Sequence, residues 1–282
     1  MKIKFFGNRR FVLEEILKRT SNVEINVIGG THLERDSFLA GQPYSIVKNK
    51  QDVMNEICKD DFDIMISNGL PYILDLQKLP SRVYVNIHPS FLPDLRGVDP
   101  VLGAILFKRD AGATCHLIDN GIDTGPIISR IKIPYSEDLT ASLLYQLSFH
   151  AEKMCFIDAW NRNFVPLGIT PKLDSTLYFT RKADTRLISF ADNDTSVIQT
   201  VKAFDNKNQG ARFFIGIEEA ICHTAWLSKN PFLDRVFPKA ENNQVVLIYE
   251  DTVIIKRKES FLFLGKIATV SDKWVGQIVV GK

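Results

Sequence analysis

Short apolar runs that end at glycine, proline or polar turns recur through the first third of the chain. Their β-branched and aromatic residues predict buried strands at residues 3–6, 23–28, 62–66 and 83–88. The stretches 11–17 and 53–58 instead place apolar residues at helical spacing. Strands that alternate with helices predict an α/β fold, a Rossmann-like, mostly parallel twisted sheet with helices on both faces.

The same pattern continues to about residue 160. It predicts a helix over 99–107, strands at 112–118 and 127–133, and a long amphipathic helix over 139–160. Residues 31–50 are polar and irregular, and we expect them to form a surface excursion without regular structure.

The pattern changes after a connector that contains Pro166 and Pro171. A helix is predicted at 197–204, followed by short strands at 245–249, 252–256 and 261–264. Short strands at close spacing predict a smaller C-terminal domain rich in antiparallel strands, either barrel-like or mixed α/β. We therefore predict two domains, 1–174 and 175–282.

Two polar side chains occupy the end of the strand predicted at 83–88. Asn86 and His88 are two residues apart, so strand alternation sends both to one side of the sheet and Ile87 to the other. Pro89 and Pro93 then prevent an immediate helix. Ligands of open α/β sheets bind at this edge. The two residues would also suit the cap of a strand end, so alone they leave both interpretations open.

Charge and cysteine content narrow the class of protein. The 282 residues carry 35 Lys and Arg against 33 Asp and Glu, too small a surplus to favour nucleic acid or an anionic membrane as the main partner. The four cysteines lack the spacing of a metal or redox motif, so we expect reduced thiols and no metal. No stretch approaches the ~20 apolar residues of a membrane span or resembles a signal peptide, which predicts a cytoplasmic protein.

Two linked motifs carry a family resemblance. The sequence Asn-Ile-His-Pro-Ser-Phe-Leu-Pro at 86–93 and the sequence Gly-Ile-Asp-Thr-Gly-Pro at 121–126 resemble the formyltransferases that use 10-formyltetrahydrofolate. The family pattern is Asn-x-His-(x)-Ser-Leu-Leu-Pro with a later Leu/Ile-Asp-x-Gly, and Phe91 replaces the usual Leu. The resemblance implies the formyltransferase fold, a 10-formyltetrahydrofolate cosubstrate and three catalytic residues, Asn86, His88 and Asp123. Taken alone, Asp123 would equally suit a turn.

The chemistry explains these residue types. Formyl transfer needs an uncharged amine and passes through a tetrahedral oxyanion. Asn86 can donate an N–H to that oxygen, and such a donor is typically worth ~3 kcal/mol. His88, with an ordinary pKa near ~6.5, can relay the amine proton to the departing folate nitrogen, and Asp123 would orient it. Whether His88 is a true base or mainly an electrostatic stabiliser stays open.

The resemblance also implies where the cosubstrate binds. Family members hold the pterin ring largely through backbone groups of the strand-end loops. In this sequence those groups belong to Leu70, Leu92, Ile118, Asn120, Gly121 and Ile122. His116 lies two residues before Ile118 and can either line the same pocket or pack within its strand.

A segment beyond the catalytic motifs indicates the acceptor. Residues 177–190 and 203–214 resemble the nucleotide-sugar N-formyltransferases, including the enzyme domain that acts on UDP-4-amino-4-deoxy-arabinose. This resemblance implies a UDP-, dTDP- or GDP-linked 4-amino or 3-amino sugar, a role in surface glycans, and a homodimer. Tyr178 and Phe179 offer faces for a sugar or base, and Arg181 and Lys182 can offset the charge of a diphosphate. Arg9, at the start of the first helix, either faces an anion or is solvated.

Two alternatives remain. Methionyl-tRNA formyltransferases share a C-terminal barrel but carry a basic insertion, whereas the corresponding stretch here, 34–47, contains one cation, Arg35. The other alternative is a non-catalytic protein that binds folate or a nucleotide sugar. The intact set of Asn86, His88 and Asp123 argues against it.

Overall fold

The computed structural model describes residues 1–169 and 176–281, and the chain divides into two compact units. The first unit comprises 1–101, 110–135 and 145–180, and the second comprises 102–109, 136–144 and 181–282. The domain boundary predicted near residue 174 lies outside the described residues.

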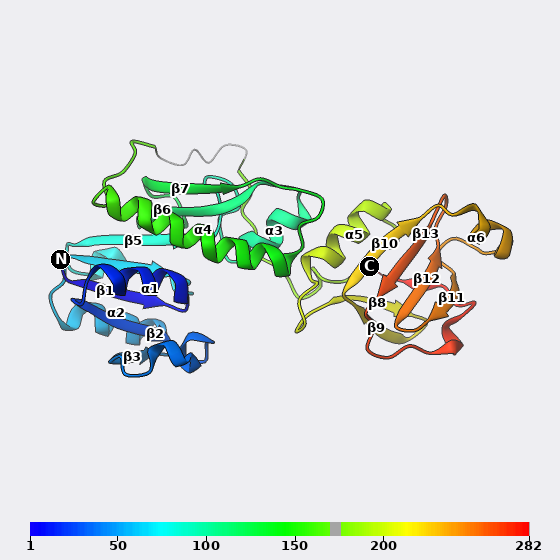
Figure 1. Ribbon diagram of the computed structural model, residues 1–282, viewed down its shortest axis with the longest axis horizontal. Helices are drawn as coiled ribbons and strands as arrows, with labels where there is room; N and C mark the ends of the chain where they lie inside the picture. Colours follow the sequence, from blue (N-terminus) through cyan, green and yellow to red (C-terminus); the bar gives the residue numbers. More distant parts are fainter. Residues whose placement is uncertain (170–175, 282) are drawn as a thin grey trace. The chain divides into compact units, whose positions relative to one another are not determined.

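A seven-stranded sheet forms the centre of the first unit (Figure 1). The strand order is β3-β2-β1-β4-β5-β6-β7, in which the five strands from β3 to β5 are parallel and β6 and β7 are antiparallel. This confirms the mostly parallel sheet. The strands are β1 (Ile3–Gly7), β2 (Val23–Ile28), β3 (Tyr44–Val47), β4 (Ile64–Asn68), β5 (Val83–His88), β6 (Ala111–Leu117) and β7 (Ile127–Ile133).

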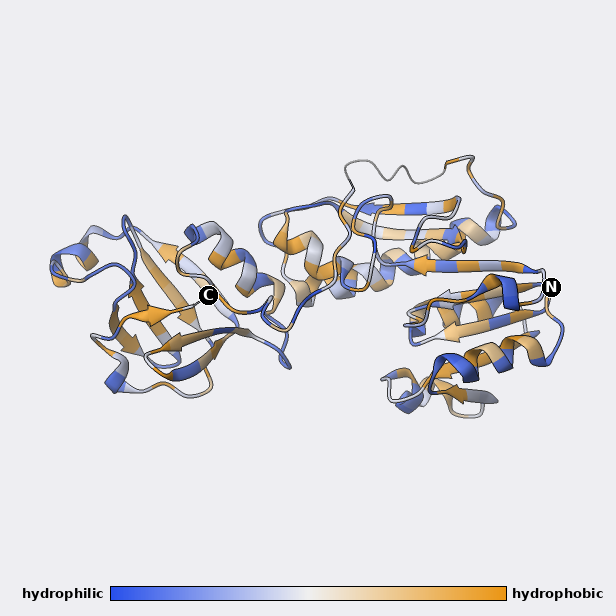
Figure 2. Cartoon of the chain, turned by 180° about the vertical axis from the view of Figure 1, so that it is seen from behind, coloured by the Kyte–Doolittle hydropathy of each residue, from blue (hydrophilic) through white to orange (hydrophobic). Residues whose placement is uncertain are grey.

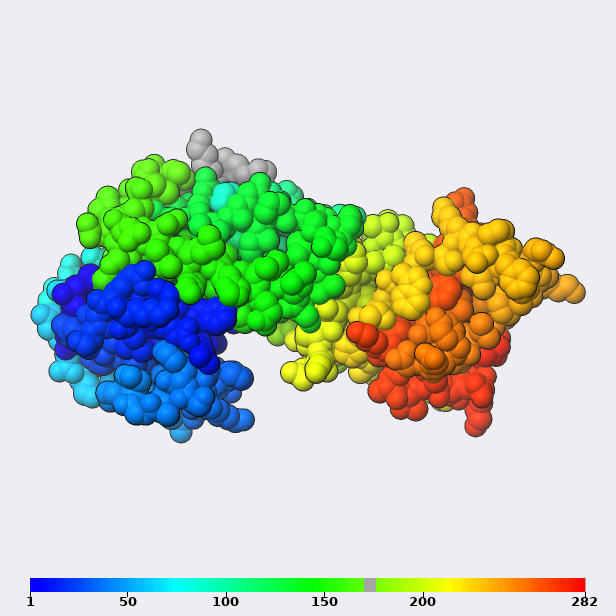
Figure 3. Space-filling model, viewed as in Figure 1, coloured from blue at the N-terminus to red at the C-terminus, as the bar shows by residue number. Residues whose placement is uncertain are grey.

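Helices cover both faces of this sheet. These helices are α1 (Arg10–Arg19), α2 (Lys50–Lys59) and α4 (Ala141–Asn161), whereas α3 (Pro100–Leu106) belongs mostly to the second unit. One face buries apolar residues of α1 and α4, such as Ile16 and Phe156, and the other buries Val53 and Ile57 of α2. Each fully buried side chain of this size stabilises the fold by about 1.5–3 kcal/mol. Figure 3 shows the surfaces of α1 (blue) and α4 (green) side by side, and Phe11 packs edge-to-face on Phe149.

The second unit contains two antiparallel sheets, as the sequence predicts for the C-terminal region. Their strand orders are β10-β13-β12-β11 and β14-β8-β9. The elements are α5 (Asp194–Ala203), β8 (Ala211–Ile215), β9 (Glu218–Cys222), β10 (Thr224–Ser228), α6 (Pro231–Val236), β11 (Val245–Tyr249), β12 (Thr252–Lys256), β13 (Phe261–Gly265) and β14 (Val279–Val280). Figure 2 shows hydrophobic residues concentrated on the strands within each unit.

The expectation that residues 31–50 lack regular structure is wrong. They contain two short 3₁₀ turns, Leu33–Arg35 and Ser37–Leu39, and the edge strand β3. β3 pairs with β2 only, and Val47 is its one buried residue. A strand that buries a single side chain leaves no apolar periodicity in the sequence, which is why the pattern conceals it. Two further 3₁₀ turns span Leu76–Lys78 and Asp272–Trp274.

Candidate active site

A cavity of about 360 Å³ opens at the carboxyl-terminal edge of the parallel strands in the first unit. Residues of the loops that follow β1, β4, β5 and β6 line it. β1 lies between β2 and β4, so the chain reverses its direction of winding beside this edge. Open α/β sheets bind ligands at such a switch point, because the loops on either side diverge there.

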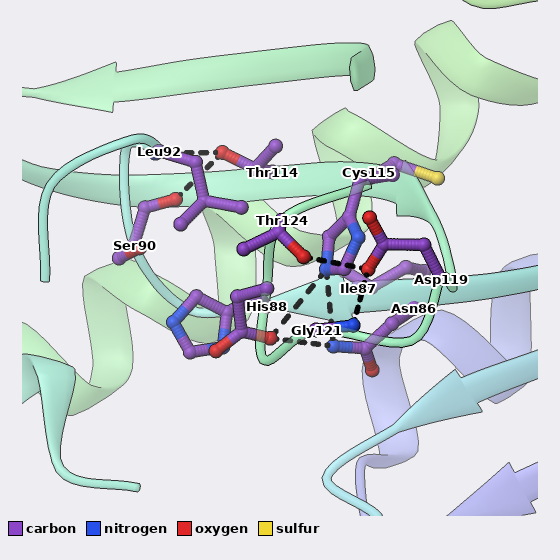
Figure 4. Close-up of polar contacts among 12 residues, drawn as sticks. Asn86, Ile87, His88, Ser90, Leu92, Thr114, Cys115, Asp119, Gly121 and Thr124 are labelled. Atoms are coloured by element: carbon purple, nitrogen blue, oxygen red, sulfur yellow. Dashed lines mark hydrogen bonds and ion pairs between the residues drawn. The ribbon is translucent and has the colours of Figure 1, made fainter. Parts of the chain in front are cut away.

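Asn86 and His88 enter this cavity from the end of β5. Both line it, and their side chains appear on the same strand in Figure 4. Ile87, between them, belongs to the hydrophobic core and is 1% exposed. The strand alternation predicted from the sequence therefore holds, and the core fixes the direction in which the two polar side chains point.

A hydrogen-bonded loop brings a carboxylate to the same place from β6. Asp119 accepts from the N–H of Gly121 at 3.0 Å and from the hydroxyl of Thr124 at 2.6 Å (Figure 4). Asp123 has a φ of 54°, a left-handed conformation that Asp tolerates better than most residues. The loop is therefore held in one shape from within, with Asp123 beside β5.

The three predicted catalytic side chains converge. Asp123 Oδ2 lies 3.6 Å from His88 Nδ1, and Asp123 Oδ1 lies 3.4 Å from Asn86 Nδ2. The Asn86 amide also lies 3.3 Å from Nε2 of His116. Both contacts of the Asn86 amide are long, so either hydrogen is available to a stronger acceptor such as an oxyanion.

His116, which the sequence left open, lines the cavity. Its Nδ1 lies 2.8 Å from the carbonyl oxygen of Leu117. Since a carbonyl can only accept, Nδ1 carries the hydrogen, and Nε2 faces both Nδ2 of Asn86 and, at 3.6 Å, Oδ1 of Asp123. His116 therefore contacts both the amide and the carboxylate of the site.

The protonation of His88 follows from the same reasoning. Its Nε2 lies 3.1 Å from the carbonyl oxygen of Leu95, so Nε2 carries the hydrogen and the lone pair of the neutral ring is on Nδ1, facing Asp123. Burial lowers the pKa of His88 below its ordinary value, although Asp123 opposes this shift. A neutral His88 is ready to accept a proton at Nδ1, and Asp123 is placed to stabilise the imidazolium that results.

Asp123 stays ionised in this setting. Burial alone would raise its pKa, but the imidazole of His88, a hydrogen bond with His116 and the N–H of Gly97, 3.0 Å away, together hold the pKa below its usual range. Gly97 has a φ of 103°, and a Cβ atom there would lie 2.8 Å from the carbonyl oxygen of Phe179. Only glycine fits this position without strain.

Four of the six residues predicted to bind the cosubstrate line the cavity. Leu70, Ile118, Gly121 and Ile122 line the cavity, whereas Leu92 and Asn120 are not among its described lining residues. The N–H of Leu92 donates to Thr114 at 3.0 Å and its carbonyl accepts from Arg130 at 3.0 Å. The remaining apolar wall, which includes Pro71 and Ile73, is suited to a flat heterocycle.

Of the five residues predicted to bind the substrate, two line the cavity. Arg9 and Tyr178 line the cavity. Two backbone hydrogen bonds fix Tyr178: the N–H of Arg96 donates to the carbonyl of Leu177 at 3.1 Å, and the N–H of Phe179 donates to the carbonyl of Arg96 at 3.0 Å. Phe179 does not appear among the described lining residues, and Arg181 and Lys182 are exposed residues of the second unit. Their roles stay predictions.

Several contributors to the site escaped the sequence analysis. The carbonyl of Leu95 and the N–H of Gly97 orient His88 and Asp123, and Asp119 closes the loop that carries Asp123. Backbone groups leave no mark in a sequence. The pattern Asp-x-Gly-x-x-Thr from Asp119 to Thr124 was the one available signal, because an Asp side chain commonly accepts from the N–H two residues later.

Residues 46–160 match the formyl transferase family. The match contains all three convergent residues and the loop of Asp119. Within the residues that the structure describes, no group of three or more His, Cys, Asp and Glu could hold a metal ion. No helix in the described part of the chain is long and apolar enough to cross a membrane.

The sequence relatives are methionyl-tRNA formyltransferases. A methionyl-tRNA formyltransferase of Kosmotoga olearia is 26% identical over 231 residues, which is 80% of this chain and 72% of that protein. Seven further methionyl-tRNA formyltransferases align over 29–54% of their own length, so the chain spans about half or less of these relatives.

Two solved structures share the fold over nearly the whole chain. WlaRD, a sugar 3N-formyl transferase determined with dTDP and 5-N-formyl-tetrahydrofolate, is 21% identical with a TM-score of 0.72, covering 96% of this chain and 99% of its own. The N-formyltransferase of Helicobacter canadensis, in complex with folinic acid and dTDP-3-aminofucose, is also 21% identical with a TM-score of 0.73, covering 95% and 99%. At this identity the likeness establishes the fold.

Replacing Asn86 with Ala is expected to lower the turnover of formyl transfer about a hundredfold, the usual cost of one lost oxyanion donor. The side chain is partly exposed in the cavity, so the variant should unfold at nearly the wild-type temperature. Steady-state kinetics with 10-formyltetrahydrofolate and the acceptor measures the effect. A variant that turns over within a fewfold of the wild-type rate would exclude Asn86 as the oxyanion donor.

Proposed function

We propose that this protein is a formyltransferase that transfers the formyl group of 10-formyltetrahydrofolate to the amino group of a nucleotide-linked amino sugar. The observation that carries the proposal is the meeting of Asn86, His88 and Asp123 in one cavity, where the amide donor of Asn86 lies 3.4 Å and the neutral base His88 lies 3.6 Å from the Asp123 carboxylate. Such a set suits acyl transfer to an amine, because the reaction needs all three groups at one carbon.

The proposed reaction begins with attack of the neutral amine on the formyl carbon. The new C–N bond forms as the carbonyl π electrons move to oxygen, where the amide of Asn86 donates to the oxyanion. The amine then gives a proton to Nδ1 of His88, and Asp123 stabilises the imidazolium. When the oxyanion collapses, the bond to N10 of the folate breaks and that nitrogen takes the proton from His88, which regenerates the site.

Three observations favour a nucleotide sugar as the acceptor. The two sugar N-formyltransferase structures match 95% or more of the chain, including its C-terminal region, and both contain dTDP or a dTDP-linked amino sugar. Tyr178 presents an aromatic face to the cavity, suited to a sugar ring or base. Arg9 presents a cation to the same cavity, suited to a phosphate.

Initiator methionyl-tRNA is the second candidate acceptor. The observation in its favour is that the named sequence relatives are methionyl-tRNA formyltransferases, one of which aligns over 80% of this chain. Against it, the net charge of +2 offers little attraction for a polyanion, and residues 34–47 contain one cation. A protein that binds folate and a nucleotide sugar without catalysis is a third candidate.

An acceptor panel separates the three. We expect formylation of at least one UDP-, dTDP- or GDP-linked amino sugar and none of initiator Met-tRNA, measured by mass spectrometry after incubation with 10-formyltetrahydrofolate. Formylation of the tRNA alone would contradict the sugar acceptor. Binding of folate and nucleotide without turnover of any acceptor would leave the non-catalytic alternative.

We propose a cytoplasmic homodimer, joined through its C-terminal part, that supplies formylated amino sugars for surface polysaccharides. Analytical ultracentrifugation at micromolar concentration tests the dimer, and the molar mass it measures should be twice the chain mass of 32.0 kDa.

A further inference from the structure

One carboxylate of α4 lies where an apolar residue would be expected. Glu152 is 1% exposed and shares the buried face of α4 with Ala151, Cys155 and Phe156. Ser148, one turn earlier, is the other polar residue buried on this helix. An ionised carboxylate at such a depth costs several kcal/mol unless another charge compensates it.

Arg9 supplies that charge from the loop between β1 and α1. Its Nε lies 4.0 Å from Oε1 of Glu152, and its guanidinium lies over the ring of Phe149 at 4.8 Å. Phe149 and Glu152 are three residues apart on α4, so they form neighbouring positions on one helix face. Arg9 is therefore held on two sides by α4 while its side chain, 25% exposed, lines the cavity.

Hydrogen bonding in this cluster is incomplete. Within the described part of the chain, Arg9 Nε, Glu152 Oε1, Asn8 Oδ1 and Asn68 Oδ1 are buried without a hydrogen-bond partner. The adjacent Arg10 differs: it is exposed and bonded to Glu14 at 2.6 Å and to Asp36 at 3.2 Å. Arg9 thus keeps guanidinium donors for a ligand, whereas the donors of Arg10 are engaged.

We propose that Arg9 and Glu152 form a proton-linked anion site, in which Arg9 binds a phosphate of the acceptor and Glu152 takes up a proton as the phosphate enters. The identity of the anion rests on the proposed function, since a nucleotide-linked sugar brings a diphosphate into the cavity that Arg9 lines. Glu152 is a positioning residue here, because it reaches the ligand only through Arg9.

Electrostatics gives the direction of the linkage. Burial raises the pKa of Glu152 to about 7, against the opposing effects of Arg9 and of a hydrogen bond from Asn68. Its neighbour Lys153 lies 3.2 Å from Glu15 of α1 and is engaged there. A phosphate on Arg9 neutralises the charge that favours ionised Glu152, so the carboxyl becomes protonated in the complex. The wild-type protein therefore binds the phosphate more tightly below pH 7, where Glu152 is protonated, and more weakly as the pH rises above 7.

Calorimetric titration of the full chain with dTDP and UDP, and with thymidine and uridine as phosphate-free controls, tests the site at pH 6 and pH 8. In Glu152→Gln the side chain is permanently neutral. The ratio of the wild-type Kd for the diphosphate to that of Glu152→Gln should rise about tenfold from pH 6 to pH 8, because a group with a pKa near ~7 ionises over this range. Taking the ratio cancels the ionisation of the nucleotide itself.

Arg9→Gln should abolish the preference for diphosphate over nucleoside, and the matched control Arg10→Gln should retain it. For the wild type at pH 8, titrations in two buffers of different ionisation enthalpy should show uptake of nearly one proton with the diphosphate and none with the nucleoside. This measurement needs no variant to fold. A Kd ratio that is flat with pH, no proton uptake, or equal effects of Arg9→Gln and Arg10→Gln would each overturn the site.

These titrations use ligands that cannot react, so they separate the site from the proposed activity. Tight, proton-linked diphosphate binding without sugar formylation would retain the anion site and remove the acceptor. If the protein formylates a nucleotide sugar but binds diphosphate no better than nucleoside, the proposed acceptor is retained and the anion site is removed.

Discussion

Asp123→Asn lowers the turnover of formyl transfer at least ~100-fold, equivalent to about 2.7 kcal/mol of transition-state stabilisation. The substitution keeps the shape of the side chain and can still accept from the N–H of Gly97, so the loop should hold its place. It removes the negative charge 3.6 Å from His88 Nδ1, which stabilises the imidazolium formed during the reaction. Single-turnover kinetics at neutral pH, together with thermal unfolding, measures the two effects.

The pH profile of the same variant gives a second result. Asp123 raises the pKa of His88 against the lowering effect of burial, so its removal should lower that pKa further and move the acid limb of the profile to lower pH. The exposed Asp61→Asn serves as a control that should leave both rate and profile unchanged. An Asp123→Asn enzyme with wild-type turnover would contradict the role of this carboxylate.

His88→Asn is the second substitution with a large expected effect, a loss of ~10²–10⁴ in kcat, the range typical of general acid–base catalysis. In the wild type, the rate should rise with pH as His88 loses its proton and reach a plateau below the pH expected of an ordinary imidazole, because burial lowers its pKa. The variant should lack this limb. Rapid-quench measurements of one turnover across pH 5–8 would provide the profile.

A control isolates the effect of the buried ring. His32→Asn removes an exposed imidazole from the same unit and should leave the profile unaltered. If His88→Asn retained both the rate and its acid limb, proton transfer would have to occur elsewhere.

Much of the fold could be predicted because most residues in the strands of the central sheet are buried. β2, β5 and β7 appear at the predicted residues, since apolar runs of that length leave few alternatives. The strands that escaped prediction, β3, β8 to β10 and β14, are exposed or half-buried on one side. β9, for example, buries Ala220 and Cys222 between exposed glutamates and Ile221, so no continuous apolar run marks it.

In the candidate site, the predictable groups are side chains and the unpredicted ones are mostly backbone groups. That Asn86, His88 and Asp123 lie together could be predicted because the two family motifs record side chains. The groups that hold them could not: the carbonyls of Leu95 and Leu117 and the N–H of Gly97 belong to the backbone. Glu152 is distant from both motifs in the sequence, and only the packing of α4 beside the β1–α1 loop brings it to Arg9.

A crystal structure of the protein with 5-formyltetrahydrofolate and a nucleotide-linked amino sugar tests the central claim most directly. The account predicts both ligands in the cavity lined by Asn86, His88 and Asp123, with the reactive end of the folate beside the Asn86 amide and the sugar amine facing Nδ1 of His88. Folate bound with its formyl end away from these three side chains, or an amino sugar bound outside this cavity, would contradict it.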